Sequence, residues 1–258
     1  MNQELKKHIT NLLDKGIRMD GRGLLDYRQG VTVEYDVSNS AEGSARVVIG
    51  ETEVLVGVKM SIEQPYPDTP NEGGLMVNAE LLPLSSPDFE SGPPSIQAIE
   101  LSRVIDRGIR ESKAIDNRKL CVIAGEKVWT VMIDVCPIND AGNLFDASAL
   151  GALAALRNTK LPKLAEGEIV DYSEKTDEKL PLSKQPVSVT VCKIGKHLII
   201  DPSIEEGKVI DARLTVATDE KGQLCALQKG GDTPLSVEEI STMLDIGIDK
   251  CNELRKAL

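Results

Sequence analysis

Three arginines at helical spacing are the residues in this sequence best suited to bind a charged ligand. Arg103, Arg107 and Arg110 lie at i, i+4 and i+7 of Ser95–Ser112, a segment whose apolar pattern predicts a helix. At roughly 100° per residue, the three side chains fall within about 60° of one another, opposite an aliphatic face. Guanidinium groups pair bidentately with phosphate oxygens, so this stripe could clamp a phosphate backbone.

A structural role for the same stripe is the alternative. Glu100, Asp106 and Glu111 are close enough along the helix to pair with one or another arginine. A stripe neutralised in this way would be a solvated, salt-bridged face with no ligand. The helix by itself leaves both interpretations open.

The composition excludes several other kinds of site. The 258 residues include only two histidines and five dispersed cysteines, so we expect no metal site, no cofactor and no disulfide scaffold. An odd set of cysteines without an export signal predicts reduced thiols in the cytoplasm. Residues 1–13 predict an amphipathic helix, and no apolar run approaches the roughly 18 residues needed to span a membrane.

The net charge of −11 argues against a general nucleic-acid binder, because counterion release needs clustered lysines and arginines. A local basic stripe is still compatible with this charge. The placement of the arginines therefore decides whether a nucleic acid could bind.

The apolar pattern predicts an α+β fold of mixed sheets with helices packed on them, because strands come in groups that helices follow. We expect strands at 31–37, 45–50, 53–60, 75–82, 128–135, 187–192, 197–201, 209–217 and 224–228. We expect helices at 1–13, 95–112, 143–158 and 236–257, the last with a capping box of Ser236 and Glu239. The chain is predicted to be a single domain, with halves at about 17–159 and 185–258 and a polar connector at about 160–184.

Several segments, in order, resemble the ribonuclease PH family. They are Arg18-Met-Asp-Gly-Arg22, Gly43–Gly50, Thr52–Gly57, Glu100–Arg107, Trp129–Asp134, Asp140–Asn143, Asp201–Glu206 and Asp211–Thr215. The resemblance covers nearly the whole chain and is greatest to the non-catalytic subunits of the archaeal exosome. It implies the ribonuclease PH fold and a hexameric ring in which three such subunits alternate with three catalytic ones. That ring shortens single-stranded RNA phosphorolytically from its 3′ end.

The groups that perform phosphorolysis in active members of the family are missing here. Active members hold inorganic phosphate with a Gly-Ser/Thr-Arg turn at a helix start, where this chain has Leu144 in place of the arginine. Asp146 is expected to add a repelling charge nearby. Of two aspartates six positions apart, Asp201 matches the first, but Gly207 stands at the second. We therefore expect no catalytic residue and no phosphorolysis by this chain alone.

The other candidates near these positions are expected to be structural. Asp201 is predicted to be a turn carboxylate, and Glu205 and Glu206 are predicted to be solvated acids. Whether any of these three keeps a catalytic role stays open. Arg18 and Arg22 are predicted to pair with acidic neighbours rather than with RNA.

The resemblance assigns Arg103 and Arg107 to the RNA backbone, facing the active site of the catalytic subunit, with Arg110 one turn further along. The prediction is thus a non-catalytic, RNA-binding subunit of a phosphorolytic 3′–5′ exoribonuclease. Its expected partners are the catalytic ribonuclease PH-like subunit, the RNA-binding cap proteins of the exosome and single-stranded RNA. An active homohexameric exoribonuclease and a pure scaffold subunit without RNA contact remain the two alternatives.

Overall fold

The computed structural model describes residues 3–165 and 169–258, and the largest of its three sheets has six strands. They are β1 (Thr32–Tyr35), β2 (Gly43–Ile49), β3 (Thr52–Glu63), β4 (Gly74–Ala79), β5 (Cys121–Ile123) and β6 (Lys127–Asn139). The order is β1-β2-β3-β6-β4, with β5 paired to β6 beside this path. Because β4 runs parallel to β6 while the other pairings are antiparallel, the sheet is mixed.

A second sheet is built from the last third of the chain. Its strands are β9 (Val187–Ile194), β10 (His197–Ile200), β11 (Ala212–Thr218) and β12 (Leu224–Gly230). They are ordered β10-β9-β11-β12, and every pairing is antiparallel. β9 and β11 are buried almost throughout, because the sheet is covered on both faces.

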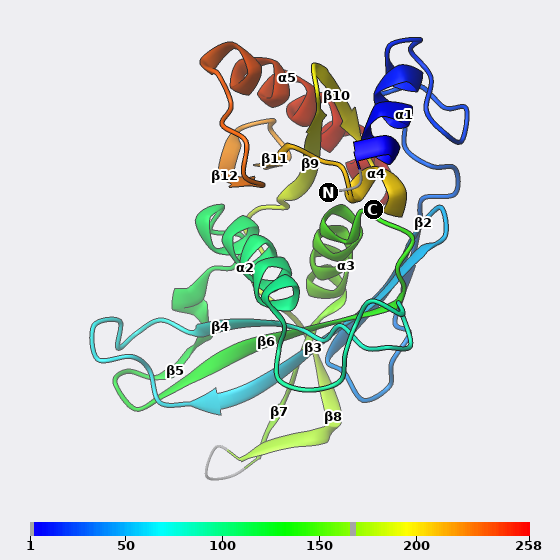
Figure 1. The fold of residues 1–258 in the computed structure, drawn as a ribbon. Coiled ribbons are helices and arrows are strands. Elements are labelled where there is room, and N and C mark those ends of the chain that lie inside the picture. The colour runs from blue at the N-terminus through cyan, green and yellow to red at the C-terminus, as the bar shows by residue number, and fades with distance from the viewer. Residues whose placement is uncertain (1–2, 166–168) are drawn as a thin grey trace.

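The helices complete a layered arrangement. They are α1 (Gln3–Leu13), α2 (Ile96–Glu111), α3 (Leu144–Asn158), α4 (Ile204–Gly207) and α5 (Val237–Leu254). α2 and α3 lie between the two sheets, and α5 packs on the far side of the second sheet against β9 and β11 (Figure 1). α1 packs its buried residues Ile9 and Leu13 beside the edge of that sheet.

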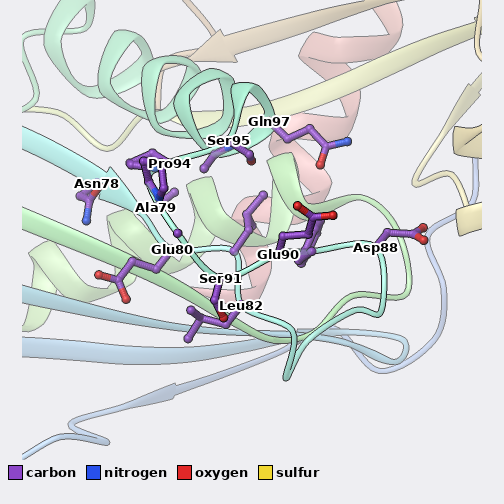
Figure 2. A pocket seen from close by; sticks show the side chains of 15 residues that line it. Asn78, Ala79, Glu80, Leu82, Asp88, Glu90, Ser91, Pro94, Ser95 and Gln97 are labelled. Atoms are coloured by element: carbon purple, nitrogen blue, oxygen red, sulfur yellow. The ribbon is translucent and has the colours of Figure 1, made fainter.

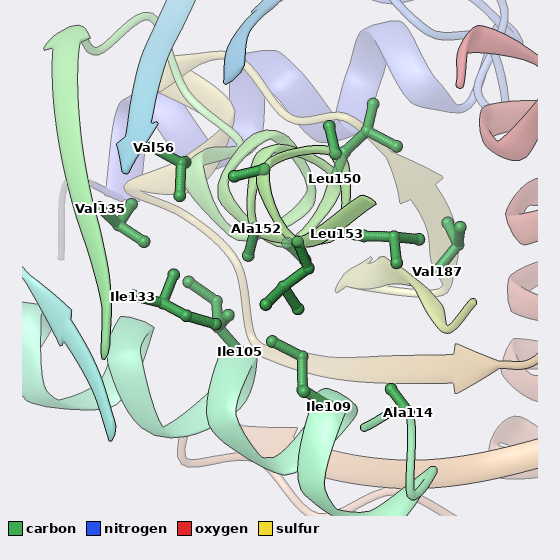
Figure 3. Close-up of a cluster of buried hydrophobic side chains, with 14 of the residues drawn as sticks. Val56, Ile105, Ile109, Ala114, Ile133, Val135, Leu150, Ala152, Leu153 and Val187 are labelled. Atoms are coloured by element: carbon green, nitrogen blue, oxygen red, sulfur yellow. The ribbon is translucent and has the colours of Figure 1, made fainter. Parts of the chain in front are cut away.

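The central helix α3 is buried along most of its length, because it contacts sheets on two sides. It is built from alanine, leucine and glycine, and a Cβ on Gly151 would lie only 2.8 Å from the side chain of Val56. Figure 3 shows Leu150 and Leu153 of this helix in one cluster with Ile105 of α2. The core thus fixes α2 and α3 against each other and against both sheets.

Every strand and helix expected from the sequence is present, and the α+β fold is confirmed; residues 1–2 of the first predicted helix lie outside the described residues. The segment 160–184 differs from a plain connector, because it contains β7 (Lys160–Leu164) and β8 (Val170–Lys179), which pair as a hairpin. Residues 166–168 of this segment are not among the described ones. The hairpin strands are mostly polar, so no alternation of apolar residues marks them in the sequence. The short elements β5 and α4 were also not predicted.

Candidate functional site

The arginine stripe lies on the exposed face of α2. The helix begins after Ser95, whose hydroxyl accepts a hydrogen bond from the backbone N–H of Ala98. Its opposite face is buried through Leu101, Val104, Ile105, Gly108 and Ile109. Arg103, Arg107 and Arg110 are all exposed, as their spacing predicts.

The three arginines differ in their partners. Arg103 and Arg107 form no hydrogen bond or ion pair with any residue that the structure describes. The Arg110 guanidinium donates to Asp106, at 2.7 and 3.0 Å, and to the carbonyl oxygen of Leu75 at 3.0 Å. The alternative of a salt-bridged face therefore fits Arg110 alone, and Arg103 and Arg107 are two guanidinium groups available to a ligand.

The predicted local pairing fails for Glu100, which pairs across the molecule instead. Its carboxylate forms an ion pair with Arg213 of β11. The Arg213 guanidinium also lies over the ring of Phe145, 4.7 Å from the ring centroid. Arg213 is thereby neutralised and held in place.

Arg18 forms a buried ion pair with Glu206, and this corrects one prediction. Arg18 and Glu206 are only 2% and 1% exposed, so Glu206 is not the solvated acid that was expected. It is buried because α4 turns it inward, where its carboxylate also completes a capping box with Ser203. Glu205, the neighbouring residue, is exposed as predicted. The pairing predicted for Arg18 is confirmed.

Asp201 is the centre of a second buried network. Its carboxylate accepts hydrogen bonds from Arg22 at 2.7 Å, from Arg28 at 2.7, 2.8 and 3.0 Å, and from the Asn143 amide at 2.9 Å. Burial alone would raise the pKa of Asp201, but the Arg28 guanidinium and backbone N–H hold this pKa below its usual value. Both oxygens are engaged, so the carboxylate has no free lone pair for proton transfer or metal binding.

A pocket of about 470 Å³ brings together the two positions at which the resemblance predicts that catalytic groups are missing. Leu144, at the start of α3, and Gly207, at the end of α4, both line it. The pocket also contains the neutralised pair of Glu100 and Arg213. Leu144 and Gly207 are 63 residues apart in the sequence, yet both face the same cavity.

The charge lining this pocket disfavours an anion. Asp88, Glu100 and Asp140 line it together with two cations, Lys208 and Arg213. The Arg213 cation is already paired. Inorganic phosphate would therefore meet an excess of negative charge and find no guanidinium free to bind it.

Asp146 does not point at this pocket, which corrects a second expectation. It is fully buried, and its carboxylate accepts hydrogen bonds from Tyr27 at 3.0 Å, Asn143 at 3.1 Å and the Thr190 backbone N–H at 2.8 Å. It faces the core because it lies on the side of α3 that packs against β9, whereas its neighbours Leu144 and Phe145 line the pocket. Burial raises its pKa to about 7.

This raised pKa predicts a pH-dependent stability. The contribution of Asp146 is fully present below about pH 4 and is lost as the pH rises through about 7, because the folded state holds the proton more tightly. We expect Asp146→Asn to gain stability relative to the parent chain over this window, by up to about 4 kcal/mol. Urea unfolding of both proteins at several pH values measures the difference. A difference that does not change with pH would contradict the prediction.

Clusters of metal-ligand side chains and membrane-spanning helices were both sought among the described residues. In ranges 3–165 and 169–258, no three His, Cys, Asp or Glu side chains gather in a way that could hold a metal ion. None of the helices in those ranges combines the length and apolarity that crossing a bilayer requires.

Sequence reasoning missed Arg28, which donates to Asp201 and to the backbone carbonyls of Ala141 and Gly142. It therefore ties the N-terminal segment to the start of α3. The only sequence signal was its position shortly after the Arg18–Arg22 motif. Its partners lie more than 100 residues away, so spacing could not reveal them.

Comparisons with known proteins give the same family over most of the chain. Residues 28–162 match the 3′ exoribonuclease family, domain 1, and residues 184–250 match domain 2 of that family. The chain is 46% identical to the exosome complex component Rrp42 of Thermococcus kodakarensis, over 98% of this chain and 93% of that protein. It is 43% identical to the component of the same name from Methanothermobacter thermautotrophicus, over 96% of this chain and 92% of that protein.

Two solved structures that resemble this chain come from archaeal exosomes. The chain superposes on a chain of the Archaeoglobus fulgidus exosome with RNA bound to the active site, with a TM-score of 0.90 and 46% identity. That match covers 98% of this chain and 97% of the other. A chain of an archaeal exosome core gives a TM-score of 0.86 and 42% identity, over 98% of this chain and 96% of that chain.

Proposed function

This chain belongs to the 3′ exoribonuclease family that includes ribonuclease PH, and we propose that it is a non-catalytic, RNA-binding component of an exosome core. The similar proteins are named as exosome components, and one similar chain comes from an exosome with RNA bound. The observation that carries the proposal is the pair of exposed, unpartnered guanidinium groups of Arg103 and Arg107 on a rigid helix.

The chemistry of the pocket supports the proposed lack of catalysis. In phosphorolysis, an oxygen of inorganic phosphate attacks the last phosphodiester of RNA, the 3′ oxygen of the preceding nucleotide leaves with a proton, and a nucleoside diphosphate is released. This chain has Leu144 where active members hold the phosphate, and its Asp201 carboxylate is fully engaged by Arg22, Arg28 and Asn143. Phosphate binding and proton transfer must therefore come from a partner subunit.

Arg103 and Arg107 complete the partner's site. They stand one helical turn apart on the same face of α2, so consecutive phosphates of one strand can each meet a guanidinium fork. The buried aliphatic face of α2 fixes the helix before RNA arrives, so little conformational entropy is lost on binding. Contacts to phosphates carry no sequence information, so RNA of any sequence is accepted.

The overall charge suits a subunit that guides RNA to one place. With a net charge of −11, most of the surface repels RNA, and the stripe of α2 is a local exception. Binding at that stripe is therefore expected to weaken steeply with added salt. The five cysteines are free thiols, which fits a reducing compartment such as the cytoplasm.

The proposed assembly is a ring of three such chains alternating with three catalytic ribonuclease PH-like subunits, covered by RNA-binding cap proteins. Native mass spectrometry of this chain mixed with its catalytic partner tests this arrangement. We expect a species with three copies of each subunit. A stable assembly of this chain alone that also trims RNA would contradict the proposal and favour the homohexameric exoribonuclease.

A further inference from the structure

The pockets at the two ends of α2 differ in the charges that line them. At the N-terminal end of the helix, a pocket of about 530 Å³ is lined by three acids, Glu80, Asp88 and Glu90 (Figure 2). None of these carboxylates forms an ion pair within the part of the chain that the structure describes. A strand held by Arg103 and Arg107 is repelled from this end.

A pocket of about 570 Å³ lies at the other end of the helix. Three cations line it, namely Arg110, Lys113 and Arg118. Leu75 and Ile109 contribute apolar surface to the same pocket. An apolar surface with cations beside it suits a nucleotide, whose base is apolar on its faces and whose phosphate is charged.

The cations of this pocket differ in how firmly they are paired. Arg110 is fixed by Asp106, whereas Arg118 is 84% exposed and lies 3.6 Å from Glu72. Lys113 is exposed, and its ammonium group forms no hydrogen bond or ion pair with the described residues. The remaining acid, Asp116, is 3.8 Å from Lys119. Lys113 is thus a free cation. Arg118 forms only a long, exposed ion pair with Glu72, so a phosphate can replace Glu72 as its partner at little cost.

Lys113 occupies a backbone position that usually belongs to glycine. It follows the C-cap Ser112 and has φ 54°, in the left-handed region. A lysine there has a conformational cost that glycine avoids. A lysine at this position lowers the stability of the folded chain, which indicates that its positive charge has a functional role.

The loop that supplies Glu72 to this pocket also carries an exposed aromatic ring. Tyr66, in the loop between β3 and β4, is 71% exposed. Bases of single-stranded RNA stack on such rings without regard to sequence.

We infer that Arg110, Lys113 and Arg118, with the loop that carries Tyr66 beside them, form a second RNA subsite at the C-terminal end of α2, next to Arg103 and Arg107. This inference rests on the proposed function. Because the 3′ end of the RNA enters the partner's active site, the subsite binds nucleotides on the 5′ side of those that Arg103 and Arg107 hold. Only RNA long enough to reach past these two arginines uses it.

Two variants test the subsite in the complex assembled with the catalytic partner. Lys113→Gly removes the cation and relieves the left-handed backbone, so it is expected to leave stability unchanged or higher. Lys113→Gly with Arg118→Ala removes both mobile cations. The matched control is Lys7→Ala with Lys221→Ala, two exposed lysines elsewhere on the surface.

Binding is measured without inorganic phosphate, so that the RNA stays intact, using oligoadenylates of about 6 and about 20 nucleotides. We expect the double variant to bind the long RNA about 10-fold more weakly, with a shallower salt dependence, and the short RNA normally. Unchanged binding of the long RNA would overturn the subsite, while loss of binding in Arg103→Glu with Arg107→Glu would still uphold the proposed function. Failure of the variant to assemble would also overturn it, because the pocket would then be a contact between subunits.

Discussion

Replacing Arg103 and Arg107 together by glutamate lowers RNA trimming by the assembled complex at least about 100-fold and leaves the ring intact. Each guanidinium makes a charge-assisted contact to phosphate worth about 1.5–3 kcal/mol, and each reversal adds repulsion. Both side chains are exposed and unpartnered in the described chain, so their replacement removes no contact that holds the fold together. The rate of nucleotide release and the mass of the complex are measured on the same sample.

Two control variants locate the cause of this loss. Lys7→Glu with Lys221→Glu makes the same change in net charge at exposed positions and is expected to leave trimming near normal. Arg103→Lys with Arg107→Lys keeps the charge but loses the planar fork, so an intermediate loss is expected. If trimming is unchanged in the glutamate variant, the RNA role is wrong. If the ring does not form, the two arginines are interface residues and the scaffold alternative is favoured.

The second large effect is expected at the buried pair of Arg18 and Glu206. Glu206→Ala leaves the Arg18 guanidinium buried without its carboxylate, which destabilises a protein by about 3–5 kcal/mol. The adjacent Glu205 is exposed, and Glu205→Ala is therefore a matched control expected within about 0.5 kcal/mol of the parent. Urea denaturation of the three proteins measures the free energy of unfolding.

Equal stabilities of Glu206→Ala and Glu205→Ala would contradict this account. Arg18 also donates to the backbone carbonyls of Ile200 and Asp201, at 2.7 and 2.9 Å. Loss of the pair should therefore loosen the segment that carries Asp201 as well. Faster backbone amide exchange at Ile200 and Asp201 in the Glu206→Ala variant would report this directly.

The exposed stripe could be read from the sequence because a helix repeats its faces every few residues. The spacing of Arg103, Arg107 and Arg110, with aliphatic residues between them, fixes which side of α2 is buried. It does not fix the partners of each arginine. Arg110 forms an ion pair with Asp106, four residues earlier in the same helix, whereas Glu100 forms its ion pair with Arg213 of β11.

The buried networks could not be read in the same way, because their members are distant in the chain. Asp201 gathers Arg22, Arg28 and Asn143 only once the second sheet has packed beside α3. Glu205 and Glu206 look alike in the sequence, and only the turn into α4 buries one and exposes the other. The family resemblance predicted that catalytic groups are missing at Leu144 and Gly207. Only the structure showed that these two residues line the same pocket.

The most direct test of the account is the phosphate-dependent release of nucleoside diphosphates from single-stranded RNA, first with this chain alone and then with its catalytic partner added. We expect no release above a mock preparation from the chain alone, and release once the partner is present. Release by the chain alone would contradict the central claim, because the pocket at Leu144 and Gly207 would then perform phosphorolysis by itself.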